Sequence, residues 1–325
     1  MPRNRLFSRQ THHIQIVDKE TLDFQPVQPL GLFFPMLEEY GVYNATGVSH
    51  ELHDAARNAS YNFVVQVKLG ALYIQFLECS SAHPQGIKFE PHALGPSIPV
   101  IHSYFSTDNY LIVVHSPNKY NLLTLIGKRN VMSAIEKTND PVRYYIFSKN
   151  TRRFVQTIEA TDEPFVMQHR INSFEDPVTS ELVLDMTSFS DWSLLARATV
   201  HILSTTNDNG DAQANYYGAV FRRVRLPSPV QTAERTAIRT VEFARKADFE
   251  LPCINPNRDS MRYNFTYAIK NKTAMQQIHV YPTRLSSTMS TLVILFRLAN
   301  RTIFVSASRS LSQDLVRLSK MTAWL

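Results

Sequence analysis

Three histidines stand far apart in this chain, and each lies where a polar stretch meets an apolar one. They are His50, His102 and His169. A neutral imidazole binds a metal ion through one ring nitrogen while a neighbouring acceptor holds the other ring N–H. A single histidine in such a place is more often a core or turn residue whose hydrogen bonds are satisfied. The residues around each histidine therefore have to distinguish these two roles.

His169 lies in the most informative stretch. The apolar run Phe165–Met167 leads into it, Asn172 follows three residues later, and an aromatic residue and two acids occupy 174–176. Residues 181–186 then have the composition of a β-strand. A histidine at the inner end of a strand, among polar groups, suits a metal ligand.

His102 begins a second stretch of the same kind. It is followed by Ser103 and Tyr104, then by Thr107-Asp108-Asn109-Tyr110, which runs into an apolar strand ending near residue 114. The alternative role for His102 is that of a turn residue in front of a buried strand.

The third candidate stretch holds two histidines. Ser49-His50-Glu51-Leu52-His53-Asp54 is polar and precedes a strand, so either His50 or His53 is available as a ligand. Ala82-His83-Pro84 is a competing stretch, but it lies so close to His102 that it gives the weaker spacing.

Taken in order, these stretches resemble the histidine motifs of the carotenoid cleavage oxygenases, a family that includes the beta-carotene oxygenases and the retinoid isomerohydrolase of the eye. The family form of the first motif has a serine or alanine before the ligand, which selects His50 over His53. Glu51 stands where the family has proline, and Tyr104 where it has phenylalanine. The resemblance thus implies His50, His102 and His169 as ligands of iron(II).

The resemblance also covers groups that support the ligands. Phe249–Pro256 is similar to a family segment in which a glutamate accepts a hydrogen bond from a ligand histidine, and this role falls on Glu250. Gln10 stands where the family has another supporting glutamate, so it would polarise an imidazole less. A fourth family histidine has no counterpart here, because His279 is the last histidine and lies on an alternating strand.

The composition limits the classes of protein that remain. The 325 residues are 44% hydrophobic and 19% charged, and the net charge of +6 is spread over short clusters. No basic run is long enough to favour nucleic-acid binding. No apolar stretch reaches the roughly 18 residues of a membrane span, and no apolar region follows the N-terminal Met-Pro-Arg. We expect a cytoplasmic protein whose basic surface contacts membranes peripherally.

The spacing of strands predicts an all-β protein with little helix. Residues 61–67 pair with 71–77 and residues 144–147 pair with 154–158 in two predicted hairpins, while 121–140 is a helix or a mixed segment. The resemblance implies a seven-bladed β-propeller, of which this chain can supply about five blades at roughly forty residues each. We therefore expect residues 1–325 to form one incomplete propeller domain, with the motifs spread over 11–270.

The resemblance implies an iron(II)-dependent dioxygenase that cleaves a C=C double bond of a carotenoid or apocarotenoid and gives aldehyde products. Its partners would be an apolar polyene and O2. Three alternatives stay open: a retinyl ester isomerohydrolase, a relative that binds a carotenoid or retinoid without cleaving it, and an inactive fragment. Because the fourth histidine is missing, we expect the 325-residue chain to bind iron weakly and to have little or no polyene cleavage activity, whereas a full-length version would be active.

Overall fold

The computed structural model describes about two thirds of the chain. The described residues are 5–9, 13–18, 20–21, 23, 28–29, 45–48, 50–68, 71–83, 86–95, 97–121, 123–124, 127, 132–160, 163–190, 192, 219–229, 239–242, 249–272, 275–282, 294–296 and 303–305. Nearly all of them form antiparallel strands, turns and bends. The prediction of an all-β protein is therefore confirmed for this part of the chain.

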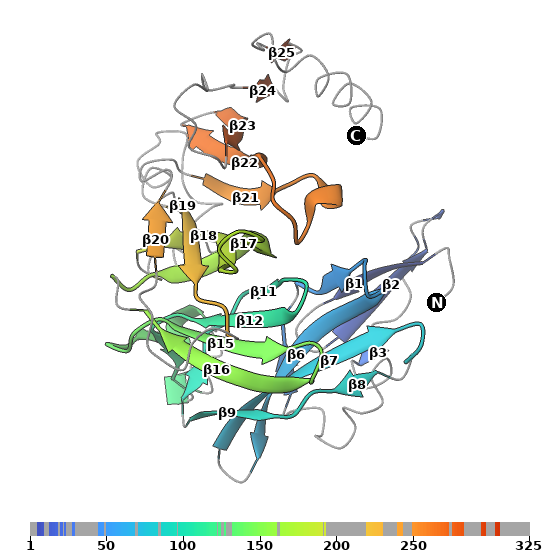
Figure 1. Cartoon of the computed structure of the whole chain (residues 1–325), viewed down its shortest axis with the longest axis vertical. Helices are drawn as coiled ribbons and strands as arrows, with labels where there is room; N and C mark the ends of the chain where they lie inside the picture. The colour runs from blue at the N-terminus through green and yellow to red at the C-terminus, as the bar shows by residue number, and fades with distance from the viewer. Residues whose placement is uncertain are drawn as a thin grey trace.

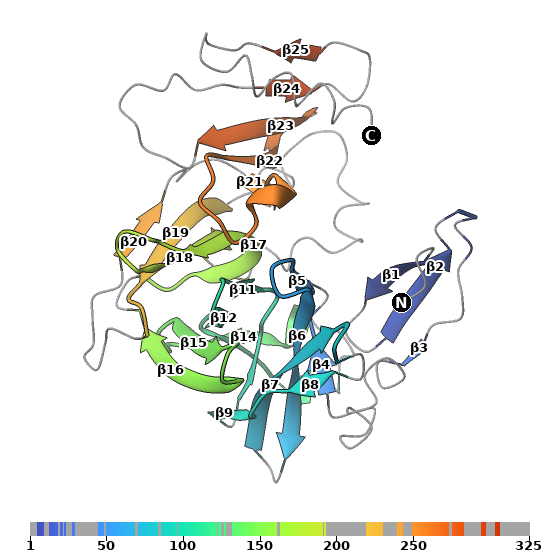
Figure 2. The same cartoon turned by 45° about the vertical axis from the view of Figure 1, so that its right-hand side comes forward.

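The strands form small sheets that follow one another in chain order around an arc (Figures 1 and 2). The first sheet holds β1 (Arg5–Arg9), β2 (His13–Asp18) and β3 (Gln28–Pro29). The second holds β4 (Ala45–Gly47), β5 (Leu52–Asp54), β6 (Ala59–Lys68), β7 (Ala71–Ser80), β8 (Ile87–Lys88) and β9 (His92–Gly95).

The third and fourth sheets have four strands each. They are β11 (Tyr104–Ser106), β12 (Tyr110–His115), β15 (Arg143–Ser148) and β16 (Arg153–Glu159), and then β17 (Val166–Glu175), β18 (Leu182–Phe189), β19 (Val220–Leu226) and β20 (Arg239–Glu242). A small side sheet joins β10 (Ile98–Pro99), β13 (Asn118–Tyr120) and β14 (Ile135–Lys137).

The arc ends with two smaller sheets, β21 (Phe249–Cys253), β22 (Phe265–Lys272) and β23 (Met275–Pro282), followed by β24 (Ile294–Phe296) and β25 (Ile303–Val305). Each larger sheet runs outward as successive antiparallel neighbours, which is the arrangement of a propeller blade. We therefore call these sheets blades.

Neighbouring blades pack face to face, and the strand β12 shows why. Its side chains alternate between the two faces of its blade, as the period of two in a β-strand requires. Leu111 and Val113 pack with the aromatic core of the preceding blade, whereas Ile112 and Val114 pack with the following blade. All four are buried because both faces of this blade are covered.

Several expected elements have the predicted positions. The hairpins are β6–β7 and β15–β16, each paired antiparallel. In 121–140 the described residues include the 3-10 turn Met132–Ala134 and β14, so this is a mixed segment. Among the described residues, no helix combines the length and the apolar character needed to cross a bilayer.

Candidate metal centre

Each candidate histidine lies in or just before an inner strand of a blade. One residue separates His50 from β5, one residue separates His102 from β11, and His169 lies within β17. β11 lies beside β5 on one side and beside β17 on the other. The three histidines therefore come from three successive blades at corresponding ends of their inner strands.

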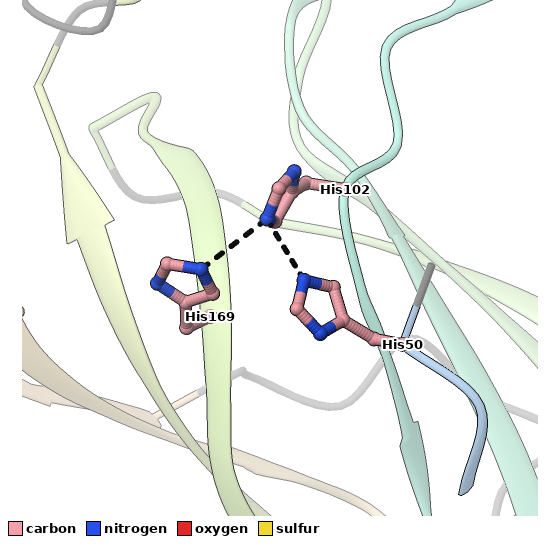
Figure 3. Close-up of side chains that lie close together, drawn as sticks. All are labelled: His50, His102 and His169. Carbon is pink, nitrogen blue, oxygen red and sulfur yellow. Dashed lines mark hydrogen bonds between the residues drawn. The ribbon is translucent and has the colours of Figure 1, made fainter. Parts of the chain in front are cut away.

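The three imidazoles converge (Figure 3). The Nε2 atom of His102 lies 3.0 Å from Nε2 of His50 and 3.3 Å from Nε2 of His169. One nitrogen from each ring lies within 4.8 Å of the others. A metal bonded at about 2.0–2.1 Å spaces its ligand nitrogens about 3 Å apart at right angles and slightly further apart in a tetrahedron. These three nitrogens have the spacing of a metal ligand set.

A β-bulge directs His169 into this cluster. The pairing of β17 with β18 is regular from Asn172 to Glu175, but its register shifts on both sides of Arg170, and the first shift lies between Met167 and Arg170 and so includes His169. A bulge bends its strand and re-aims a side chain, and bulges often occur beside functional sites.

Burial and the neighbouring rings favour the neutral forms of two of the three histidines. Burial, together with the neighbouring His169 and His50, lowers the pKa of His102 to about 3. Burial and His169 also lower the pKa of His50. A charged ring is disfavoured where it is desolvated and close to another imidazole, so His50 and His102 are neutral at neutral pH, the form that binds a metal ion.

Tyr104 ties the blade of His102 to the blade of His50. Its side chain is fully buried, and its hydroxyl donates to the carbonyl of Tyr61 and accepts from the backbone N–H of Leu52 at 3.2 Å. Leu52 is two residues beyond His50, so this hydroxyl fixes the strand that carries the histidine. The sequence marked Tyr104 only as a departure from phenylalanine, and its partners were not foreseeable without the register of the blades.

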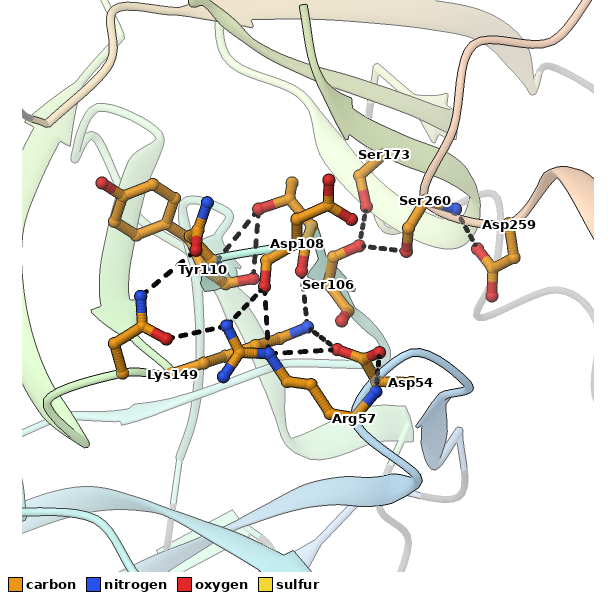
Figure 4. A network of polar contacts seen from close by, with 12 residues as sticks. Asp54, Arg57, Ser106, Asp108, Tyr110, Lys149, Ser173, Asp259 and Ser260 are labelled. Carbon is orange, nitrogen blue, oxygen red and sulfur yellow. Dashed lines mark hydrogen bonds and ion pairs between the residues drawn. The ribbon is translucent and has the colours of Figure 1, made fainter.

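A second set of bonds joins the opposite ends of the same strands (Figure 4). Lys149, whose side chain has no exposed surface, binds Asp54 at the end of β5 at 2.7 Å and the carbonyl of Thr107 just after β11. Glu175, at the end of β17, accepts from the Thr107 hydroxyl at 2.8 Å and from the backbone and side chain of Asn109. The inner strands are thus held at the ends away from the histidines.

A half-open cavity of 320 Å³ adjoins the cluster. Its lining combines two of the histidines with apolar, polar and charged neighbours: His50, Glu51, Leu52, Ser103, Tyr104, His169, Arg170, Leu251 and Pro252. Leu251 comes from the inner strand β21 of the next blade, where its φ of 51° places it in the left-handed region. A strained non-glycine residue beside a cavity is typical of a binding site.

The remaining residues singled out in the sequence lie elsewhere or are not described. His53 and His83 are exposed and outside the cluster. The backbone of Glu250 pairs with Ile269 in β21, but its side chain lies outside the described part of the structure. The same holds for the side chain of His279, and Gln10 is not described at all.

The donor set fits a divalent transition metal. Imidazole nitrogen suits iron, zinc, copper and nickel, so the three histidines accept iron(II) without selecting it by chemistry alone. Among the described residues, this is the only group of three or more histidine, cysteine or acidic side chains with the spacing of a metal site.

The family of the chain is settled by its sequence. The model of the family described as retinal pigment epithelial membrane protein matches residues 4–304. The chain belongs to this family. It is the carotenoid oxygenase family whose motifs the sequence resembles, so the resemblance is confirmed.

Relatives of known name agree with this membership. A mitochondrial carotenoid-cleaving dioxygenase from Mustela putorius furo is 28% identical over 235 residues, which are 68% of this chain and 41% of that protein. A variant of the Synechocystis apocarotenoid oxygenase has a TM-score of 0.63 at 14% identity, over 86% of this chain and 55% of that one. The cobalt-substituted form of the same oxygenase gives 0.60 at 16% identity, with the same coverage.

These comparisons also confirm the fold. The described blades form part of the seven-bladed propeller of the carotenoid oxygenases. The chain spans about half the length of the relatives that it matches.

Proposed function

We propose that His50, His102 and His169 bind iron(II) and that the protein is a dioxygenase that cleaves a C=C double bond of a carotenoid or apocarotenoid. The observation that carries this proposal is the convergence of three imidazole nitrogens, 3.0 and 3.3 Å apart, in a chain of the carotenoid oxygenase family. Cleavage of one double bond by O2 leaves one oxygen atom on each carbon, so two carbonyl products form and no further reductant is consumed.

The side chains of this protein would bind and orient the reactants. Iron(II), when bound, would supply the open coordination positions at which O2 is activated. The cavity beside His50 and His169 offers Leu52, Leu251 and Pro252 as apolar contacts for a polyene. Ligand pockets of about 300–1,000 Å³ enclose ligands of drug size. The volume of this cavity, 320 Å³, lies at the lower end of that range, so it would hold a segment of a polyene.

Glu250 remains our proposed acceptor for the second ring N–H of a ligand histidine, most directly His169. The strand β21 that carries Glu250 lies beside β17, which supports this pairing. We expect Glu250→Gln to weaken iron(II) binding by about 10–100-fold, as loss of such an acceptor commonly does. An unchanged iron affinity in a titration would remove Glu250 from the site.

The substrate class also bears on where the protein acts. A carotenoid is dissolved in membranes, so we propose a single propeller domain that collects its substrate at a membrane surface from the cytoplasmic side. One relative is named mitochondrial, so localisation by fluorescent tagging of the chain is the direct test.

The function is tested by loading the purified chain with iron(II) anaerobically and supplying a carotenoid in detergent with ¹⁸O2. The expected result is a small amount of aldehyde product with ¹⁸O in both fragments, formed well below the rate of a relative with four histidine ligands, and its loss in His102→Ala. His53→Ala is the matched control, because His53 is an exposed histidine three residues after His50. Carotenoid binding without product would support the non-catalytic alternative, and release of retinol from a retinyl ester would support the isomerohydrolase.

A further inference from the structure

The pairing of β17 with β18 is irregular at the bulge that carries His169. The register shifts between Met167 and Arg170 and again between Arg170 and Asn172. Backbone N–H and C=O groups away from water need partners, and leaving one without a partner costs about 1–3 kcal/mol. Side chains that bind the backbone at such a shift stabilise the bulged register.

Side-chain hydroxyls take that place on both sides of His169. Ser103 donates to the carbonyl of Gln168 at 2.7 Å and accepts from the N–H of Arg170 at 3.2 Å. Thr187, on the neighbouring strand β18, accepts from the N–H of His169 at 3.1 Å. Ser103 is 3% exposed and Thr187 is fully buried, so both hydroxyls are largely shielded from water.

We propose that Ser103 and Thr187 are positioning residues that hold the bulge in the register that directs His169 toward His102 and His50. This inference rests on the metal centre proposed above. Ser103 follows His102 directly in the chain, so its two bonds join the backbone of one ligand to the residues on either side of another.

The physical reason lies in the period of a strand. A slip of one residue moves every side chain of a β-strand to the opposite face. If the hydroxyls were absent, β17 would gain ladder bonds by closing the bulge, and His169 would turn away from the cluster. In the bulged register, the hydroxyls of Ser103 and Thr187 form hydrogen bonds with the backbone groups of residues 168–170.

The experiment compares variants of the full chain. Ser103→Ala removes both bonds of the serine, and Thr187→Val removes the acceptor of His169 N–H while keeping the shape of the side chain. Thr187→Ser restores an acceptor. Ser173→Ala is the matched control, since Ser173 is also buried on β17 and its hydroxyl donates to the carbonyl of Ser106 at 2.7 Å, away from the bulge.

Cobalt(II) is the probe, because its visible absorption reports ligand number and geometry. For Ser103→Ala and Thr187→Val we expect cobalt(II) affinity to fall about 10–100-fold, the usual loss when a group that orients a ligand is removed, with an altered absorption spectrum. Thr187→Ser and Ser173→Ala should keep the wild-type spectrum. Equal losses in Ser103→Ala and Ser173→Ala would overturn the proposal, as would an unchanged spectrum in Thr187→Val.

Amide hydrogen exchange in the metal-free protein separates this inference from the metal centre itself. The N–H groups of His169 and Arg170 should exchange faster in Ser103→Ala and Thr187→Val than in the wild type, while Ser173→Ala leaves them protected. If the wild type bound no cobalt(II), the metal centre would fail, and the exchange of these two amides would still decide the role of the hydroxyls. If Ser103→Ala does not fold, the pair Thr187→Val and Thr187→Ser decides alone.

Discussion

At the scale of single residues, the candidate centre is a set of three histidine rings, and burial favours the neutral form of two of them, His50 and His102. Burial lowers the pKa of His102 to about 3, so this ring stays neutral throughout the physiological range. Each ring was recognisable in the sequence from its motif. Ser103, Tyr104 and Thr187 were not recognisable as supports, because their hydrogen bonds cross between strands whose register the sequence does not reveal.

Tyr104 gives a prediction about stability at this scale. Tyr104→Phe keeps the buried ring but removes the hydroxyl that accepts from Leu52 N–H and donates to the Tyr61 carbonyl. We expect the free energy of unfolding to fall by about 1–2 kcal/mol, the cost of leaving such groups without that partner. Denaturant unfolding measures it, and an unchanged midpoint would show that water or another group replaces the hydroxyl.

At the scale of strands and blades, alternation in the sequence predicted the hairpins β6–β7 and β15–β16 correctly. It did not predict the register shifts within β17 or between Ile146 and Phe147. Alternation assigns side chains to faces, whereas a bulge depends on what the neighbouring blade offers to the interrupted backbone. The sequence motif at His169 was therefore found without the feature that aims its side chain.

The ion pair of Lys149 and Asp54 gives a prediction about how blades are joined. Asp54→Asn leaves the buried ammonium of Lys149 with the Thr107 carbonyl and the face of Tyr61, 5.0 Å away. We expect a loss of about 3–5 kcal/mol in the free energy of unfolding, as for other buried pairs that lose one partner.

Glu159→Gln is the matched control for this change. Glu159 pairs with Arg143 at 2.9 Å on the surface, with 47% of its side chain exposed. An exposed pair contributes about 0–1 kcal/mol. Similar losses in both variants, measured by denaturant unfolding, would show that Lys149 is solvated rather than buried.

The buried carboxyl of Asp176 leads us to expect that the free energy of unfolding depends on pH. Burial would raise the pKa of its carboxyl, but hydrogen bonds from Val178, Arg262, Thr179 and Arg225 lower it to about 2. A carboxyl with a lowered folded-state pKa stabilises the protein above its unfolded-state pKa near 4, and this contribution is lost as the pH falls toward 2. From the shift we expect about 2 kcal/mol at neutral pH.

Unfolding of the wild type and Asp176→Asn at several pH values checks this expectation. The difference in unfolding free energy between them should be largest above pH 4 and should shrink as the pH falls to 2. A constant difference across this range would mean that the carboxylate charge contributes nothing beyond the contacts that asparagine also makes.

At the scale of the whole molecule, composition and strand spacing were enough to predict an all-β protein, and three motifs in order were enough to identify its family. The closeness of the three histidines could not be derived from spacing, because it depends on how successive blades turn about a common axis. The described residues supply three imidazoles where the family resemblance implies four. We therefore expect this chain to bind iron(II) more weakly than a relative with four histidine ligands.

We propose that His50, His102 and His169 bind one iron(II) ion together, and X-ray absorption can count their rings around the metal. The chain is loaded anaerobically with one equivalent of iron(II), and His102→Ala and His53→Ala are loaded in the same way. We expect three imidazole ligands at about 2 Å in the wild type and in His53→Ala, and weaker binding with fewer imidazoles in His102→Ala. Equal iron affinity and an equal number of imidazoles in the wild type and His102→Ala would show that these histidines do not share a metal ion.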